Sequence, residues 1–202
     1  MKFGKILLVA ILTAISLAAA EAALAQTRMQ TGERAVPPAG FLGFCAKHLS
    51  DCLAHSREAA IVELNDERRS QLERVQTRVN AAIRPREDAQ HVWDYPTDGT
   101  GDCNRYALAK RRDLLALGFP QSALLLATAL TERGEGHLVL VVRTDRGDLV
   151  LDNRVAHTLD WSELPYRWIS MQSPQSPVQW LRVLSRPIAT ADARGAAALA
   201  TK

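Results

Sequence analysis

The sequence has little excess of either charge. Its 25 lysine and arginine residues nearly balance its 22 aspartate and glutamate residues, and the formal net charge at pH 7 is +3. So small a bias, spread along the chain, argues against a nucleic-acid partner or an acidic membrane surface. The chain also lacks internal repeats, and beyond residue 25 it lacks an apolar run long enough for a transmembrane helix. We therefore expect one soluble domain of ordinary size.

The first 25 residues have the three parts of a secretory signal peptide. Lys2 and Lys5 precede an apolar run over residues 6–20, and residues 23–25 (Ala-Leu-Ala) form a small-x-small cleavage site before Gln26. The apolar run is too short to span a bilayer comfortably, so an uncleaved membrane anchor is the less favoured alternative. We expect a mature chain that begins near Gln26, is periplasmic or secreted, and has no stable membrane span.

Composition divides the rest of the chain into three parts. Residues 26–40 lack a periodic pattern and are expected to form a flexible lead-in, and residues 41–188 to form the folded domain. Residues 189–202 are mostly alanine and small polar residues, which predicts a disordered tail. Early in the domain, Asn65 can cap a helix whose apolar residues Leu72 and Val75 share one face.

The chain has three cysteines, which in an exported protein suggests one disulfide and one free thiol. Cys45 and Cys52 are close in sequence and form the favoured pair, which leaves Cys103 free. In one straight helix their Cα atoms would be about 10 Å apart, beyond the disulfide limit of roughly 7 Å. The bridge therefore requires a turn or a broken helix. Two buried free thiols are the alternative, less favoured in an oxidising compartment.

Cys103 is expected in the first turn of a helix. Asp102 is a natural N-cap, good helix formers follow to Leu117, and Gly118 starts the C-terminal stop. A helix N-terminus favours the nucleophilic thiolate, and its free N–H groups can hold an oxyanion. The alternative is a small buried residue that packs the helix on the sheet. The glycine-rich residues 99–101 favour an exposed cysteine instead.

His137 and Asp152 lie on two strands of a predicted hairpin. Strands are expected over residues 123–129, 137–144 and 149–153, with a turn over residues 145–148, so the fold class is α+β. If the hairpin turned tightly at residues 146 and 147, Asp152 would lie opposite Val141, roughly 13 Å along the ladder from His137. A hydrogen bond between them therefore requires a shifted register, a bulge or a strong twist.

The segments 98–112 and 134–153 resemble the bacterial transglutaminase-like cysteine peptidases, and the similarity extends from about Cys45 to Leu184. The best-known members are periplasmic, calcium-dependent proteases that clip surface adhesins. The resemblance implies a papain-like core, with the catalytic cysteine at a helix N-terminus packed on an antiparallel sheet. It places a catalytic triad on Cys103, His137 and Asp152.

The segment around the cysteine departs from the family pattern. Calcium-dependent members have Asp-Cys-Glu-Asp here, whereas this chain has Asp102, Cys103, Asn104 and Arg105. Asp102 and Asn104 are the candidate calcium ligands, but Arg105 puts a cation where the pattern has a carboxylate. Calcium needs several oxygen ligands with compensating negative charge. We therefore expect no cofactor.

The leading hypothesis is an exported cysteine peptidase that hydrolyses a peptide bond through a thioester intermediate. Its partner would be a protein or peptide, such as a cell-envelope protein. A transglutaminase or amidase using the same triad is the second hypothesis, since it differs only in the acceptor of the acyl group. The third is a non-catalytic periplasmic binding module of the same fold, which Arg105 beside the cysteine favours and the complete Cys-His-Asp set opposes.

Overall fold

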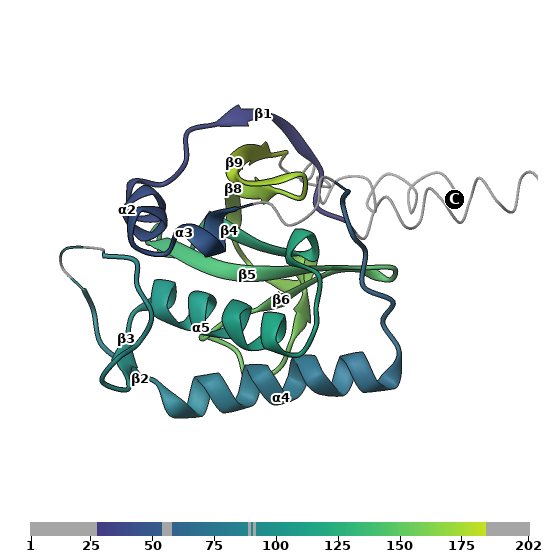
Figure 1. Ribbon diagram of the computed structural model, residues 1–202, viewed down its shortest axis with the longest axis horizontal. Helices are drawn as coiled ribbons and strands as arrows, with labels where there is room; N and C mark the ends of the chain where they lie inside the picture. Colours follow the sequence, from purple (N-terminus) through teal and green to yellow (C-terminus); the bar gives the residue numbers. More distant parts are fainter. Residues whose placement is uncertain (1–27, 54–57, 89, 91, 185–202) are drawn as a thin grey trace, which may run out of the picture.

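The computed structural model describes residues 28–53, 58–88, 90 and 92–184 (Figure 1). Seven antiparallel strands form one sheet in the order β1-β9-β8-β4-β5-β6-β7. They are β1 (Thr31–Ala35), β4 (Leu124–Leu130), β5 (Gly136–Thr144), β6 (Gly147–Leu151), β7 (Leu159–Asp160), β8 (Arg167–Ser173) and β9 (Ser176–Val183). The predicted signal peptide and the predicted tail over residues 189–202 lie outside the described residues.

The α-helices share one apolar cluster with one face of the sheet. The α-helices are α2 (Ala39–Lys47), α3 (Leu49–Cys52), α4 (Asp66–Ala82) and α5 (Cys103–Ala116), with short 3₁₀ turns η1 (Gln121–Ala123) and η2 (Trp161–Glu163). A small parallel pair joins β2 (Arg84–Pro85) to β3 (Thr100–Gly101). None of the helices in the described ranges is long and apolar enough to cross a membrane.

The fold is α+β, as predicted, and the sheet, α5 and α4 form three successive layers. Helix α5 packs against β5, and α4 packs on the outer side of α5 (Figure 1). Alternate residues of β4 and β5 enter two apolar clusters, with Leu126 and Leu140 in one and Leu125 and Val141 in the other. Because both faces of these strands are buried, they read as continuous apolar runs in the sequence.

Helix α4 forms where the sequence predicts it. The Asn65 side chain accepts a hydrogen bond from the Arg68 N–H at 2.8 Å, which caps the helix, and Leu72, Val75 and Val79 are all buried. These three residues share one face because they follow the spacing of about 3.6 residues per turn. The helix therefore offers a single apolar stripe to α5.

The lead-in predicted over residues 26–40 differs from the structure. Residues 31–35 form β1, an edge strand in which Thr31 pairs with Val183 and Ala35 with Trp180. The side chains of β1 are exposed or half-buried, so the strand carries no apolar alternation that a sequence pattern could detect. Backbone hydrogen bonds to β9 hold it, and such bonds leave no trace in composition.

The disulfide between Cys45 and Cys52 is present, with the two Cα atoms 5.7 Å apart. The predicted break in the helix is also present, because α2 ends at Lys47 and α3 begins at Leu49. His48 lies between the two helices with φ −125° and ψ 61°, outside the helical region. The change of direction there brings the cysteines within bridging distance.

The β5–β6 hairpin turns one residue earlier than the tight turn considered from the sequence. Thr144 pairs with Gly147, so Asp145 and Arg146 alone form the loop. The Asp145 carboxylate accepts a hydrogen bond from the Leu64 N–H, so contacts with the segment before α4 help to fix the turn. Gly147 has φ 119°, a conformation that favours glycine. Compared with the tight turn at residues 146 and 147, the observed register places each residue of β6 beside a β5 residue two positions closer to His137.

Candidate active site

Cys103 is the first residue of α5, and its side chain is half-buried and not in a disulfide. Asp102 caps the helix, since its carboxylate accepts hydrogen bonds from the N–H groups of Asn104 and Arg105. The capped N-terminus lies at the edge of a groove with a volume of about 1240 Å³. The thiol is therefore held at the positive end of a helix and can be reached from solvent.

His137 lies near the start of β5 and is only 8% exposed. Its Nε2 is 2.8 Å from Asp152 Oδ1, and its side chain lines the same groove as Cys103. Burial by itself lowers the pKa of His137, but the hydrogen bond to Asp152 and the proximity of Asp152 and Cys103 outweigh it and raise the pKa to about 9. The imidazolium form is thus present at neutral pH, with its charge next to the sulfur. A neighbouring cation favours a thiolate, the nucleophilic form of cysteine.

Asp152 lies one residue beyond β6 and is 1% exposed. Continuing the observed register puts it beside Val139, roughly 7 Å along the ladder from His137 rather than 13 Å. The two side chains span that separation. Burial raises the pKa of Asp152, but hydrogen bonds from His137 and Tyr166 and the charge of His137 lower it below its usual range. Asp152 is therefore a buried carboxylate that stays ionised.

Polar side chains of α4 and α5 lie near the backbone of Asp152. Gln76 and Asn80 of α4 both donate to the backbone carbonyls of Asp152 and Val155, at distances from 2.7 to 3.2 Å. Lys110 of α5 is fully buried, and among the described residues its amine has no hydrogen-bond partner. Burial lowers the pKa of Lys110 to about 7, against the opposing attraction of Asp152. This cluster fixes the backbone that carries Asp152.

The groove beside Cys103 has walls from several segments. They include Trp93, Asp102, Thr128, Glu135, Gly136 and Ile169. Gly134 has φ +80°, and a Cβ at Gly136 would meet open space, so the loop before His137 leaves room for a substrate backbone.

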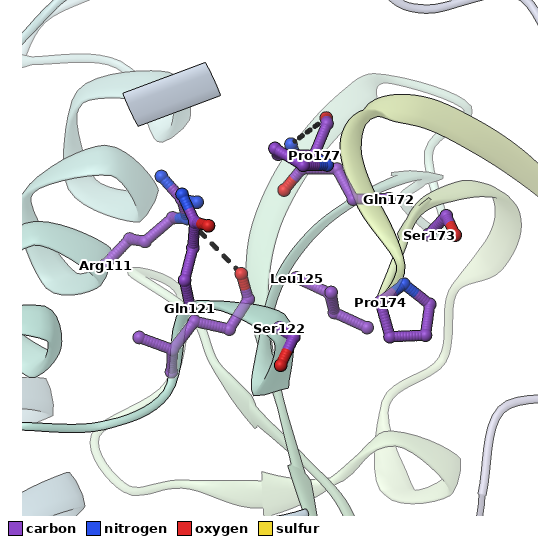
Figure 2. A pocket seen from close by; sticks show the side chains of 9 residues that line it. Arg111, Gln121, Ser122, Leu125, Gln172, Ser173, Pro174 and Pro177 are labelled. Carbon is purple, nitrogen blue, oxygen red and sulfur yellow. Dashed lines mark hydrogen bonds between the residues drawn. The ribbon is translucent and has the colours of Figure 1, made fainter. Parts of the chain in front are cut away.

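A pocket elsewhere is unsuitable for a substrate. It lies between Arg111, Gln121 and Gln172 and has a volume of about 10 Å³, near the lower limit for one water molecule. Figure 2 shows that two of the polar side chains around it, Arg111 and Gln172, bond to carbonyl groups of the pocket wall. Arg111 Nε donates to the Leu124 carbonyl and Gln172 Nε2 donates to the Pro177 carbonyl. Of these two hollows, only the groove at Cys103 has the size and the chemistry of an active site.

A family model for bacterial transglutaminase-like cysteine proteinases matches residues 31–187. The chain belongs to this family of cysteine peptidases. The peptidase also resembles solved structures of Legionella pneumophila LapG. One is 26% identical, with a TM-score of 0.47, and covers 55% of this chain and 67% of that one. The calcium-bound form is 21% identical, with a TM-score of 0.48, and covers 64% and 79%. No match was found among curated proteins.

The candidate calcium ligands beside Cys103 form hydrogen bonds within the peptidase itself. Asp102 Oδ2 accepts from the Asn104 side-chain amide at 2.9 Å, and Oδ1 accepts from two backbone N–H groups. The Arg105 guanidinium donates to the Tyr95 carbonyl at 3.2 Å and lies 3.5 Å from Asp88. Both candidate ligands are thus engaged, and a cation already neutralises the nearby carboxylate. Across the described ranges, no three His, Cys, Asp or Glu side chains are grouped as a metal site.

Sequence reasoning missed three residues that contact or neighbour Asp152. Tyr166 donates to its Oδ2, the Arg154 backbone N–H donates to its Oδ1 at 3.0 Å, and Lys110 is a nearby buried charge. Tyr166 lies within the region that resembles the family, but no local sequence pattern marks it as a site residue. A lysine at a buried helix position is a signal that the apolar spacing around it could have revealed, because Ala107 and Leu114 on the same face are buried too.

Proposed function

We propose that this peptidase hydrolyses peptide bonds in exported proteins, with Cys103 as nucleophile, His137 as the proton-transfer group and Asp152 as the group that orients His137. The observation that carries the proposal is the position of His137. Its Nε2 is 2.8 Å from a buried carboxylate, and its ring lines the same groove as a thiol at a helix N-terminus, close enough for that thiol to influence the pKa of His137. This arrangement has the geometry of a nucleophile, a base and an orienting group.

In the proposed reaction, the Cys103 thiolate attacks the scissile carbonyl carbon and forms a C–S bond. The backbone N–H of Cys103, at the start of α5, is available to stabilise the oxyanion. The His137 imidazolium gives its proton to the leaving amine as the C–N bond breaks, which leaves a thioester. A water molecule then attacks the thioester and gives a proton to His137. Release of the acid restores the thiolate and the imidazolium.

Two other functions share this fold. A transglutaminase or amidase would use the same thioester and replace water by an amine or act on a side-chain amide. A non-catalytic binding module was favoured by Arg105 beside the nucleophile. The Arg105 guanidinium instead bonds to Tyr95 and Asp88. This placement supports an active enzyme, because the Arg105 guanidinium is held by these two groups and so does not count against Cys103 as a nucleophile.

We propose export through the signal peptide over residues 1–25, with activity in the periplasm or outside the cell. The disulfide between Cys45 and Cys52 supports this location, because structural disulfides persist in oxidising compartments. We also propose that activity does not depend on calcium, although LapG has been solved both with calcium and after EGTA treatment. Arg105 of this chain supplies the positive charge that holds Asp88 near α5.

A peptidyl probe with a thiol-reactive group tests the nucleophile directly. We expect labelling of the mature protein at Cys103, mapped by mass spectrometry, and no labelling of Cys103→Ala. His137→Ala should slow labelling by more than tenfold with the melting temperature nearly unchanged. His157→Ala is the matched control, since His157 is 77% exposed and away from the groove. Equal labelling of the His137 and His157 variants would contradict the proposal.

A further inference from the structure

Tyr166 contacts both proposed partners of the nucleophile. It lies just before β8 and is half-buried, and its hydroxyl donates to Asp152 Oδ2. The other carboxylate oxygen, Oδ1, faces His137 Nε2 at 2.8 Å. The Tyr166 ring also packs edge-on against the His137 ring, with centroids 5.4 Å apart and planes at 72°. One side chain thus touches the carboxylate and the imidazole from the same side.

Further contacts hold Tyr166 in this orientation. The Tyr166 ring packs against the Trp168 ring, with centroids 5.7 Å apart. The Arg154 guanidinium lies over the Tyr166 ring, 5.6 Å from the ring centroid. Arg154 Nη1 donates to the phenol oxygen at 3.4 Å, and Arg154 also forms a salt bridge with Glu132 at 2.6 Å. Glu132 belongs to the loop between β4 and β5 that borders the groove. The phenol is therefore fixed between the groove rim and Asp152.

The phenol is a permanent donor to Asp152. Burial and the hydrogen bond to the Asp152 carboxylate raise the pKa of Tyr166 well above its usual value, so it stays protonated at neutral pH. A hydrogen bond to a charged group is stronger than a neutral one, and it stabilises the ionised carboxylate. Without it, one oxygen of a carboxylate that is 1% exposed would lack its side-chain donor.

We infer that Tyr166 is a positioning residue for the reaction: its hydroxyl holds Asp152 ionised and oriented so that Oδ1 faces His137. This inference rests on the proposed function of Cys103, His137 and Asp152. It assigns to Tyr166 a role through Asp152, with no contact to the substrate. The expected consequence is a change in pH dependence, which a residue that only packs would not cause.

The test is the rate of Cys103 alkylation by iodoacetamide as a function of pH, quantified by mass spectrometry on the mature chain. Tyr166→Phe keeps the ring and removes the hydroxyl. A lost hydrogen bond to a charged group raises the pKa of the carboxylate by about one unit. The acid limb of the profile is the range in which the alkylation rate falls as the pH falls. We therefore expect this limb to lie about one pH unit higher in Tyr166→Phe than in wild type. At pH values below the limb, the alkylation rate of Tyr166→Phe would be about tenfold lower than that of wild type.

Tyr106→Phe is the matched control. Its hydroxyl donates to the Ile83 carbonyl in the core, away from Asp152, so this variant should lower the melting temperature without moving the acid limb. Arg154→Gln removes the positive charge but keeps a side-chain amide that can donate to the phenol oxygen in place of Arg154 Nη1. If the acid limb of this variant moved as far as that of Tyr166→Phe, the shift would come from charge, and the assignment to Tyr166 would be wrong.

Failure of the inference and failure of the proposed triad give different results. If Tyr166→Phe has the wild-type profile while His137→Ala and Asp152→Asn alter it, the triad is supported and Tyr166 has no positioning role. If His137→Ala and Asp152→Asn also keep the wild-type profile, the triad itself is wrong, and the role of Tyr166 falls with it. Melting curves of each variant establish that the comparison is made between folded proteins.

Discussion

Replacing Lys110 by methionine should stabilise this enzyme, although the substitution removes a buried charge. The Lys110 side chain is fully buried in α5, and among the described residues its amine has no hydrogen-bond partner. Burial lowers its pKa from 10.5 to about 7. Since one pKa unit corresponds to about 1.4 kcal/mol, holding this amine in the core costs roughly 5 kcal/mol below pH 7. Methionine has a similar shape and no amine to desolvate.

The pH dependence follows from the sign of the change in pKa. Between about pH 7 and pH 10.5 the unfolded chain binds more protons at Lys110 than the folded chain does. Stability therefore rises with pH in that window, by at most about 1.4 kcal/mol per pH unit. His137 has the opposite effect, because its raised pKa gives a contribution that is lost as the pH rises through about 9. That term is common to wild type and Lys110→Met, so it cancels to first order in their difference.

Urea unfolding at pH 6, 8 and 10, followed by tryptophan fluorescence with the disulfide intact, measures this difference. We expect Lys110→Met to be more stable by several kcal/mol at pH 6 and the advantage to shrink as the pH approaches 10. Arg112→Met is the control, since it removes a cation that is 52% exposed on the same helix. A destabilised Lys110→Met, or a stability difference that does not change with pH, would refute the reasoning.

Three other predictions follow from the site and the disulfide. Replacing both Cys45 and Cys52 by serine should lower the unfolding free energy by about 2.5 kcal/mol in urea titrations, the value for a short closed loop, and an unchanged midpoint would contradict this. Asp152→Asn should keep measurable turnover, above that of His137→Ala, in a single-turnover assay, because an orienting group contributes less than the base. Wild type should show the same melting temperature in EGTA and in calcium, whereas Arg105→Asp should gain calcium-dependent stability, and the same reversal at exposed Arg69 should not.

Local sequence rules predict the elements that present the site. The N-cap at Asp102, the helix that follows and the strand that carries His137 all depend on residues adjacent in sequence. The hairpin register does not, because the Asp145 side chain bonds to Leu64, a residue 81 positions away. A local turn rule therefore placed Asp152 two positions too far along β5. The error matters because it is the difference between a separated pair and a hydrogen bond.

Residues that act only through tertiary contacts were harder to predict. Tyr166 reaches Asp152 from the segment before β8, and nothing in its own neighbourhood of sequence points to a carboxylate. Strand β1 forms because its backbone pairs with β9, from the other end of the domain. Neither contact has a periodic signature, so both require knowledge of the topology. The broken helix between Cys45 and Cys52 was accessible because disulfide geometry set a distance limit on a short segment.

A buried lysine without a hydrogen-bond partner among the described residues lies near the proposed site, where the charge of Asp152 acts on it. A carboxylate that is 1% exposed needs donors and positive charge to stay ionised, and its neighbours come from separate elements. His137 is on β5 and Tyr166 precedes β8, whereas Lys110 on α5 adds charge without a hydrogen bond. A well-packed core would have an apolar residue at position 110. Because natural proteins break such rules chiefly at functional sites, the desolvated lysine near Asp152 is itself an argument that this carboxylate is there for chemistry.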